Sequence, residues 1–211
     1  MAREGNDKGL PSGSIKGLKM KANGFCEEVI IAGFGGQGII LTGRLLAQTA
    51  MKAGKEVTYM PSYGAEMRGG TANSMVVIAD DPIASPLVSK PNSLIAMNKA
   101  SLNKFAPRVK AGGLVVMNNS LIDTKPEVDE TIDVLAVPAD EIAVELGNQK
   151  CANMVVLGAY LQKSGLFGPD AAAACLADVL AARYHKTLPI NSEALRRGAE
   201  LAETRSCRTR S

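Results

Sequence analysis

Residues 29–41 read VIIAGFGGQGIIL: a short apolar run, a glycine-rich turn and the start of an apolar helical pattern. The run at 29–32 carries β-branched residues, which is typical of a buried strand in a parallel sheet. Residues 33–38 satisfy G-x-G-x-x-G, and the apolar spacing over 38–53 predicts a helix. A strand, a glycine turn and a helix in this order predict a Rossmann-like α/β fold.

The rest of the chain extends this alternation and then becomes helical. We expect further strands at 56–60, closed by Pro61, and at 71–79, 93–97, 114–117 and 131–137, and helices at 99–109, 139–146, 152–163, 170–184 and 192–203. The pattern predicts a three-layer Rossmann-like domain with a mostly parallel sheet and a helical C-terminal extension. We expect this domain to span residues 25–203. A flexible N-terminal extension at 1–24 precedes it, and a flexible tail at 204–211 follows it.

Composition and charge exclude several classes of function. The 211 residues are 46% hydrophobic and 21% charged, as in an ordinary globular protein. The basic excess lies in the two terminal segments, so no nucleic-acid partner is expected. No long apolar run or secretory signal is present, which predicts no membrane partner and a cytoplasmic location. Four widely spaced cysteines and one histidine predict no metal site within this chain.

The glycine turn is the first candidate site. Gly33, Gly35, Gly36, Gln37 and Gly38 stand where backbone N–H groups at a helix N-terminus can approach a phosphate. The alternative is that the glycines only allow the helix to pack closely on the strand. The second strand ends in TYMP at 58–61 without the acidic residue that holds a nucleotide ribose, so a nicotinamide cofactor is not expected.

A second candidate segment, PSYGAEMRGG at 61–70, lies between two expected strands at the ligand-facing edge of the sheet. Tyr63, Glu66 and Arg68 are its candidates for contact with a charged ligand or a partner subunit. In the alternative interpretation, Glu66 and Arg68 pair with each other in a structural crossover. No nucleophile elbow, Walker loop or H-E-x-x-H occurs, so no catalytic residue is assigned to this chain.

Three further residues have simpler explanations than a role in a site. Cys151 and Cys175 are expected to be buried small apolar side chains. We interpret Asn153 as a cap or turn residue and not as a ligand contact.

The two glycine-rich segments together, 31–38 and 61–70, resemble the gamma subunit of 2-oxoacid:ferredoxin oxidoreductases, over about residues 26–185. The resemblance implies oxidative decarboxylation of a 2-oxoacid on thiamine diphosphate, electron transfer through iron–sulfur clusters to ferredoxin, and release of the acyl group on coenzyme A. This chain lacks the motifs for thiamine diphosphate, magnesium or a cluster. The resemblance therefore implies that thiamine-binding alpha and beta subunits, and a ferredoxin-like subunit or ferredoxin, hold them.

For this chain the resemblance implies assembly and the coenzyme A side of the reaction, through the two glycine-rich loops. It favours 2-oxoglutarate as the substrate. Two other interpretations remain open at this point. One is a free-standing Rossmann-like nucleotide-binding protein or dehydrogenase, and the other is an assembly module without a ligand.

Overall fold

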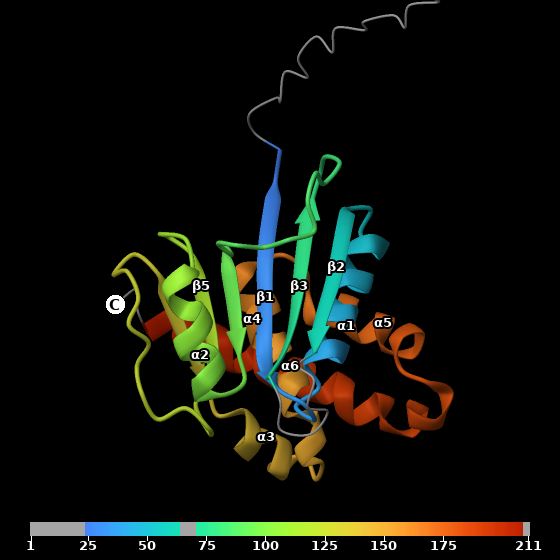
Figure 1. Ribbon diagram of the computed structural model, residues 1–211. Helices are drawn as coiled ribbons and strands as arrows, with labels where there is room; N and C mark the ends of the chain where they lie inside the picture. The colour runs from blue at the N-terminus through green and yellow to red at the C-terminus, as the bar shows by residue number, and fades with distance from the viewer. Residues whose placement is uncertain (1–23, 64–70, 209–211) are drawn as a thin grey trace, which may run out of the picture.

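The computed structural model describes residues 24–63 and 71–208. They form a six-stranded sheet of order β2-β3-β1-β4-β5-β6, with helices on both of its faces (Figure 1). The strands are β1 (Cys26–Phe34), β2 (Glu56–Tyr63), β3 (Thr71–Ala79), β4 (Ser93–Ala96), β5 (Leu114–Asn118) and β6 (Asp133–Val137).

Five of the six strands run in one direction. β1, β4, β5 and β6 pair in parallel, while β3 lies antiparallel between β1 and β2. The carboxyl ends of the five like-directed strands therefore meet at one edge of the sheet, where ligands bind in open α/β folds. The prediction of a mostly parallel Rossmann-like sheet is confirmed, with β3 as the reversed strand.

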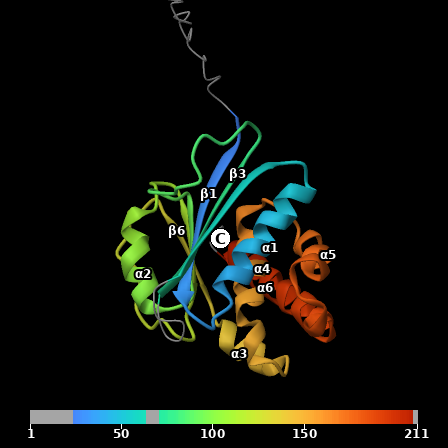
Figure 2. The same ribbon diagram turned by 45° about the vertical axis from the view of Figure 1, so that its right-hand side comes forward.

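The helices divide between the two faces (Figure 2). One face is covered by α1 (Ile39–Lys52), α4 (Ala152–Ser164), α5 (Pro169–Val179) and α6 (Leu188–Arg208), and the other by α2 (Lys99–Phe105). The short helix α3 (Ala139–Glu145) lies near the carboxyl edge, and 3-10 turns occupy Ala106–Arg108, Gln149–Cys151 and Ala182–Thr187. Within the described residues, no helix combines the length and the apolarity that crossing a membrane needs.

Side-chain alternation along β1 creates two cores. Val29 and Ile31 face α1 and α4, while Ile30 and Ala32 face α2, and all four are fully buried. A strand buried on both faces reads as a continuous apolar run, which is why the sequence marks β1 so clearly.

The second strand is longer than predicted. Pro61, expected to close it, lies inside β2 and pairs with Ser74, and the strand continues to Tyr63. β2 is the outermost strand, and proline is tolerated at a sheet edge because its missing N–H is not needed there. Residues 61–63, assigned from sequence to the glycine-rich loop, therefore belong partly to the sheet.

Three helices end or begin differently from the prediction. The helix expected at 99–109 stops at Phe105 and tightens into a 3-10 turn that contains Pro107. The helix expected at 170–184 stops at Val179, because Leu180 adopts an extended backbone. The last helix, α6, begins at Leu188 and continues to Arg208, into the segment assigned from sequence to the tail.

Candidate functional site

A cavity lies at the point where the connections of the sheet diverge. The chain leaves β1 for α1 on one face and leaves β4 for α2 on the opposite face. Such a switch point opens a crevice at the carboxyl ends of the two strands. The cavity there has a volume of about 200 Å³ and is lined by Gly36, Gln37, Met97, Asp140, Gln149, Lys150, Ala152 and Asn153.

The backbone of the glycine turn depends on its glycines. Gly36 and Gly38 have φ of 100° and 74°, in the left-handed region that favours glycine. A Cβ at Gly33 would lie 2.6 Å from the side chain of Ile39, and one at Gly38 would lie 2.3 Å from Nδ2 of Asn153. Gly35 is half-buried between them. Close packing of α1 on β1 therefore accounts for Gly33, and the approach of Asn153 from α4 accounts for Gly38. Gly36 is exposed, and its Cβ would meet no described atom within 4 Å.

Gln37 points inward and joins the ends of two strands. Its Oε1 accepts hydrogen bonds from the N–H of Phe34 at 2.7 Å and from Nδ2 of Asn98 at 3.0 Å. Its Nε2 donates to the carbonyl of Met97 at 3.1 Å. The amide therefore fixes the glycine turn against the end of β4, at the rim of the cavity.

Asn153 reaches the glycine turn from the first turn of α4. Its Nδ2 donates to the carbonyl of Gly38 at 3.3 Å and to Oγ1 of Thr42 at 3.1 Å, and the side chain is buried. No side chain among the described residues caps the N-terminus of α1. The N-terminus of α1 carries unsatisfied N–H groups and the positive end of the helix dipole, a combination that favours an anion.

Polar groups of both signs line the rest of the cavity. Asn118 at the end of β5 donates to Oδ2 of Asp140 at 2.6 Å and accepts from the N–H of Ala139 at 3.3 Å, which holds the start of α3 in place. Lys150 also lines the cavity; it is exposed and has no ion-pair partner among the described residues. The cavity thus offers a cation for a phosphate and a carboxylate for hydroxyl donors.

The structure gathers most of the predicted site residues at one edge. Strand register places Gly33 opposite Ala72 of β3, and Ala72 opposite Tyr63 of β2, so the glycine turn and Tyr63 share the carboxyl edge. Glu66 and Arg68 lie outside the described residues.

Of the eight residues that line the cavity, only Gly36 and Gln37 were predicted from sequence as site residues. The polar ones that were not assigned to the site are Asp140, Gln149, Lys150 and Asn153. The sequence could have indicated Asp140 as a site residue, because it lies at the start of a helix directly after a strand of the parallel sheet. The interpretation of Asn153 as a cap or turn residue is wrong: it is buried inside α4 and donates to Gly38 and Thr42. Nothing in the local sequence relates it to Gly38, which precedes it by 115 positions.

The described side chains do not fit a metal or an iron–sulfur cluster. Among the side chains that the structure describes, no three of His, Cys, Asp or Glu gather closely enough to ligate a metal. Cys151 and Cys175 are buried, as predicted, and burial raises the pKa of the Cys151 thiol. A nitrogen of the His185 ring lies 3.0 Å from the carbonyl of Leu180, in an exposed turn away from the cavity. No chemical step through a cluster or metal is assigned to this chain.

The fold and the cavity define the class: a doubly wound α/β domain whose ligand edge carries a glycine turn. A protein-family model described as pyruvate ferredoxin/flavodoxin oxidoreductase matches residues 28–201. The chain belongs to this family.

Similar proteins span several members of the family. The 2-oxoglutarate synthase subunit KorC of Methanocaldococcus jannaschii is 35% identical over 72% of this chain and 82% of its own length. The ketoisovalerate oxidoreductase subunit VorA of Methanothermobacter marburgensis is 41% identical over 68% of this chain. This chain covers only 29% of the length of VorA, so it corresponds to one part of that larger protein.

Solved structures agree with the family assignment. The gamma subunit of a keto/oxoacid ferredoxin oxidoreductase from Geobacter sulfurreducens has a TM-score of 0.71 and 27% identity, over 84% of this chain and 99% of that one. The 2-oxoglutarate:ferredoxin oxidoreductase from Magnetococcus marinus, solved with 2-oxoglutarate, coenzyme A and succinyl-CoA bound, has a TM-score of 0.75 and 26% identity. The match covers 85% of this chain and 31% of that one. The predicted resemblance to gamma subunits is confirmed.

Proposed function

We propose that this chain is the gamma subunit of a 2-oxoglutarate:ferredoxin oxidoreductase and contributes to its coenzyme A site. The observation that carries this proposal is the cavity at the switch point between β1 and β4, lined by the glycine turn. The family assignment supports the class of reaction, and the position of the cavity supports a ligand at this edge of the sheet.

The chemistry of the cavity suits the phosphate end of coenzyme A. The uncapped N-terminus of α1 and the ammonium group of Lys150 favour an anion, and Asp140 can accept a hydrogen bond from a hydroxyl group. A volume of about 200 Å³ holds only part of coenzyme A, so partner subunits would complete the site. The exposed glycine at position 36 allows a ligand or a partner backbone to approach closely.

The second glycine-rich segment belongs to the same proposal. Tyr63 lies at the edge that carries Gly33, and we propose that Tyr63, Glu66 and Arg68 contact coenzyme A or the thiamine-binding subunits. In this proposal Gly35, Gly36 and the backbone around Gln37 face the same ligand.

Other subunits supply the redox chemistry in this proposal. Thiamine diphosphate, magnesium and the iron–sulfur clusters belong to alpha and beta subunits and to a ferredoxin-like subunit or ferredoxin, and the complex works in the cytoplasm. When bound, these groups would supply decarboxylation and electron transfer. This chain would bind and orient part of coenzyme A.

We propose 2-oxoglutarate as the substrate because a relative of similar length, KorC, is named for it and shares 35% identity. VorA, a ketoisovalerate oxidoreductase subunit, is 41% identical but much longer. The experiment below therefore includes both oxoacids.

The test is to purify the chain with its native partners under anaerobic conditions and to measure viologen reduction that depends on coenzyme A. The complex is expected to be more active with 2-oxoglutarate than with ketoisovalerate, pyruvate or indolepyruvate. If the chain purifies alone and binds a dinucleotide, a free-standing nucleotide-binding protein replaces the proposal.

One variant tests the cavity directly. Lys150→Gln removes an exposed cation that lines the cavity. The KM for coenzyme A is expected to rise roughly three- to tenfold with little change in kcat. A rise of this size corresponds to the loss of about 1 kcal/mol of charge interaction. Lys90→Gln, an exposed lysine in the loop between β3 and β4, is the matched control. Equal KM values for the two variants would place coenzyme A elsewhere.

A further inference from the structure

A second cavity lies at the opposite edge of the sheet, where β1, β4, β5 and β6 begin. Its volume is about 370 Å³. The end of α4 forms one wall, and the turn before β5 forms another. The residues around it are Phe25, Glu27, Asn92, Ser93, Lys110, Ala111, Gly112, Gly113, Leu114, Asp133, Lys163, Ser164 and Leu166. The glycine turn is at the other end of β1, so this cavity is separate from the proposed coenzyme A site.

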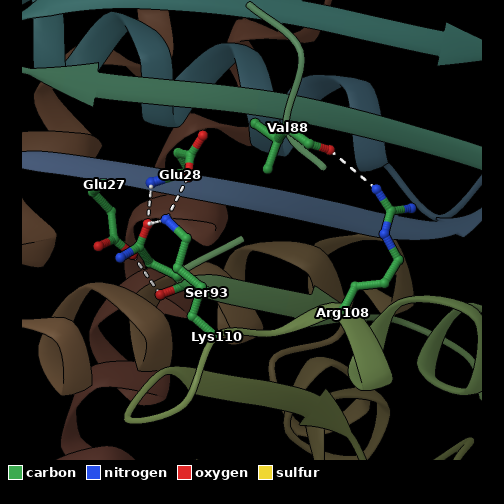
Figure 3. A network of polar contacts seen from close by, with 7 residues as sticks. Glu27, Glu28, Val88, Ser93, Arg108 and Lys110 are labelled. Atoms are coloured by element: carbon green, nitrogen blue, oxygen red, sulfur yellow. Dashed lines mark hydrogen bonds and ion pairs between the residues drawn. The ribbon is translucent and has the colours of Figure 1, made fainter. Parts of the chain in front are cut away.

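Glu27 holds one carboxylate oxygen inside the protein and leaves the other available. Its Oε1 accepts from the hydroxyl of Ser93 at 2.5 Å and from the hydroxyl of the fully buried Tyr160 at 3.4 Å. No described residue donates to Oε2, and Figure 3 shows the Glu27 carboxylate joined to Ser93 through a single oxygen. Burial raises the pKa of Glu27, although hydrogen bonds from Ser93 and Tyr160 partly oppose that shift.

The two lysines at the cavity already have partners. Lys110 pairs with Glu28 at 2.5 Å and also donates to Oδ1 of Asn92 at 3.0 Å (Figure 3). Lys163 pairs with Asp133 at 2.6 Å. Among the described residues, the carboxyl group of Glu27 is therefore the one at this cavity without an ion-pair partner, so its ionised form would add an unbalanced negative charge.

Three ligand classes fit poorly. An anion would face the uncompensated Glu27 carboxylate while both lysines are neutralised by partners. A metal ion would need more ligating groups than any cluster of described residues provides. A guanidinium group pairs best with both carboxylate oxygens, but Oε1 is occupied by Ser93 and Tyr160.

We propose that this cavity binds a primary ammonium group on a short hydrocarbon chain, with Oε2 of Glu27 as its acceptor. The ammonium group is a compact cation that needs only one carboxylate oxygen, and Phe25, Leu114 and Leu166 provide apolar wall for the hydrocarbon. Its source is either a free small amine or the lysine side chain of a partner subunit.

The test uses the full-length chain with n-butylammonium chloride as the probe, and 1-butanol and sodium chloride at matched concentration as controls. Calorimetry is expected to show saturable binding of the ammonium ion only. Affinity should increase as the pH rises through the pKa of Glu27, which burial raises, because Glu27 must lose its proton while the amine keeps its own. The other groups that face Glu27 are Tyr160, which stays neutral, and the paired side chains Lys110, Lys163, Glu28 and Asp133.

Two variants make the test specific. Glu27→Gln keeps the shape of the side chain and an oxygen that can accept the hydrogen bond from Ser93, but it removes the charge. It is expected to weaken the binding of butylammonium roughly tenfold or more. Asp123→Asn removes a carboxylate from an exposed ion pair with Lys99, away from the cavity, and is expected to bind like the wild type. Equal affinity for Glu27→Gln and wild type, affinity independent of pH, or no saturable binding would each overturn the proposal.

The same titration on the purified complex identifies the source of the ammonium group. If the complex no longer binds butylammonium while the isolated chain does, a partner lysine occupies the cavity. If both bind it with similar affinity, the ligand is a free small amine. The outcome does not depend on where coenzyme A binds, because the two sites lie at opposite ends of β1.

Discussion

At the scale of single residues, amide side chains shape the ligand edge. Gln37 bonds to Phe34, Asn98 and Met97, and Asn153 bonds to Gly38 and Thr42. Both side chains fix backbone groups of the glycine turn from within the protein. The turn is therefore held in one conformation, which would lower the entropic cost of binding the proposed coenzyme A there.

Glu27 should make stability depend on pH. Because burial raises its pKa in the folded protein above that in the unfolded chain, the folded state holds this proton more tightly. Its contribution to stability is full at acidic pH and is lost as the pH rises towards the folded pKa. Glu27→Gln, which cannot ionise, is expected to be more stable than wild type near pH 7 and no more stable near pH 4. Urea unfolding at the two pH values measures this.

Glu28→Gln is the control for that measurement. It breaks the half-exposed ion pair with Lys110 and is expected to lose roughly 0.2 to 1 kcal/mol near neutral pH. If Glu27→Gln is also destabilised at neutral pH, the carboxylate of Glu27 is better solvated than its burial indicates.

The sequence predicted the glycine turn at residue level but not the cavity beside it. A local pattern specifies Gly33 to Gly38, because the turn and helix start are made by neighbouring residues. Asp140, Lys150 and Asn153 join the cavity only through the folding of distant segments. The inward orientation of Gln37 depends on Met97 and Asn98, which follow β4.

At the scale of elements, the closest helix contact is the crossing of α4 and α6. Gly158 of α4 lies against the backbone of Leu195, and Gly198 of α6 lies against the backbone of Val155. The absence of side chains at these two positions allows the helices to touch backbone to backbone. Every residue from Ala152 to Leu161 is buried, because α4 lies between the sheet and α6.

Gly158→Ala should destabilise the protein in spite of alanine's higher helix propensity. The new Cβ would lie 1.9 Å from the carbonyl oxygen of Leu195, so the two helices must separate. This separation is expected to lower the free energy of unfolding by roughly 1–3 kcal/mol or more. The higher helix propensity of alanine would return only about 1 kcal/mol. Gly168→Ala is the control, because its Cβ would meet no described atom within 4 Å and its φ is −67°. Thermal unfolding compares them, and equal melting temperatures would contradict a tight crossing.

Periodicity located most elements and misjudged several of their ends. The buried strands, the apolar face of α1 and the largely apolar run of α4 extend over enough residues to be recognised. The ends depend on other features: the edge position that lets β2 continue through Pro61, and the extended backbone of Leu180 that stops α5. Neither feature is visible in the local sequence.

At the scale of the whole molecule, the C-terminal helix is part of the core. The sequence predicted a helical extension, and the structure shows α6 packed across α4 behind the sheet (Figure 1). Ala194, Leu195, Ala199 and Ala202 are buried there. The reversed direction of β3 could not be predicted, because the local pattern of a buried strand is the same in either direction.

Truncation after Thr187 should therefore abolish cooperative folding. Loss of α6 would expose the apolar surface of α4 and leave the larger core open on one side. Thermal unfolding followed by circular dichroism is expected to lose its sigmoidal transition, whereas deletion of residues 209–211 should preserve it. A cooperative transition in the truncated chain would show that α6 is dispensable for the core.

The central position of β1 also affects how the protein is made. β1 is synthesised first among the strands, yet both of its neighbours, β3 and β4, come later, and the helix that closes the core comes last. A nascent chain emerging from the ribosome therefore carries the apolar run 29–32 without a partner for much of its synthesis. We expect this stretch to be a binding site for ribosome-associated chaperones until the final helix is released.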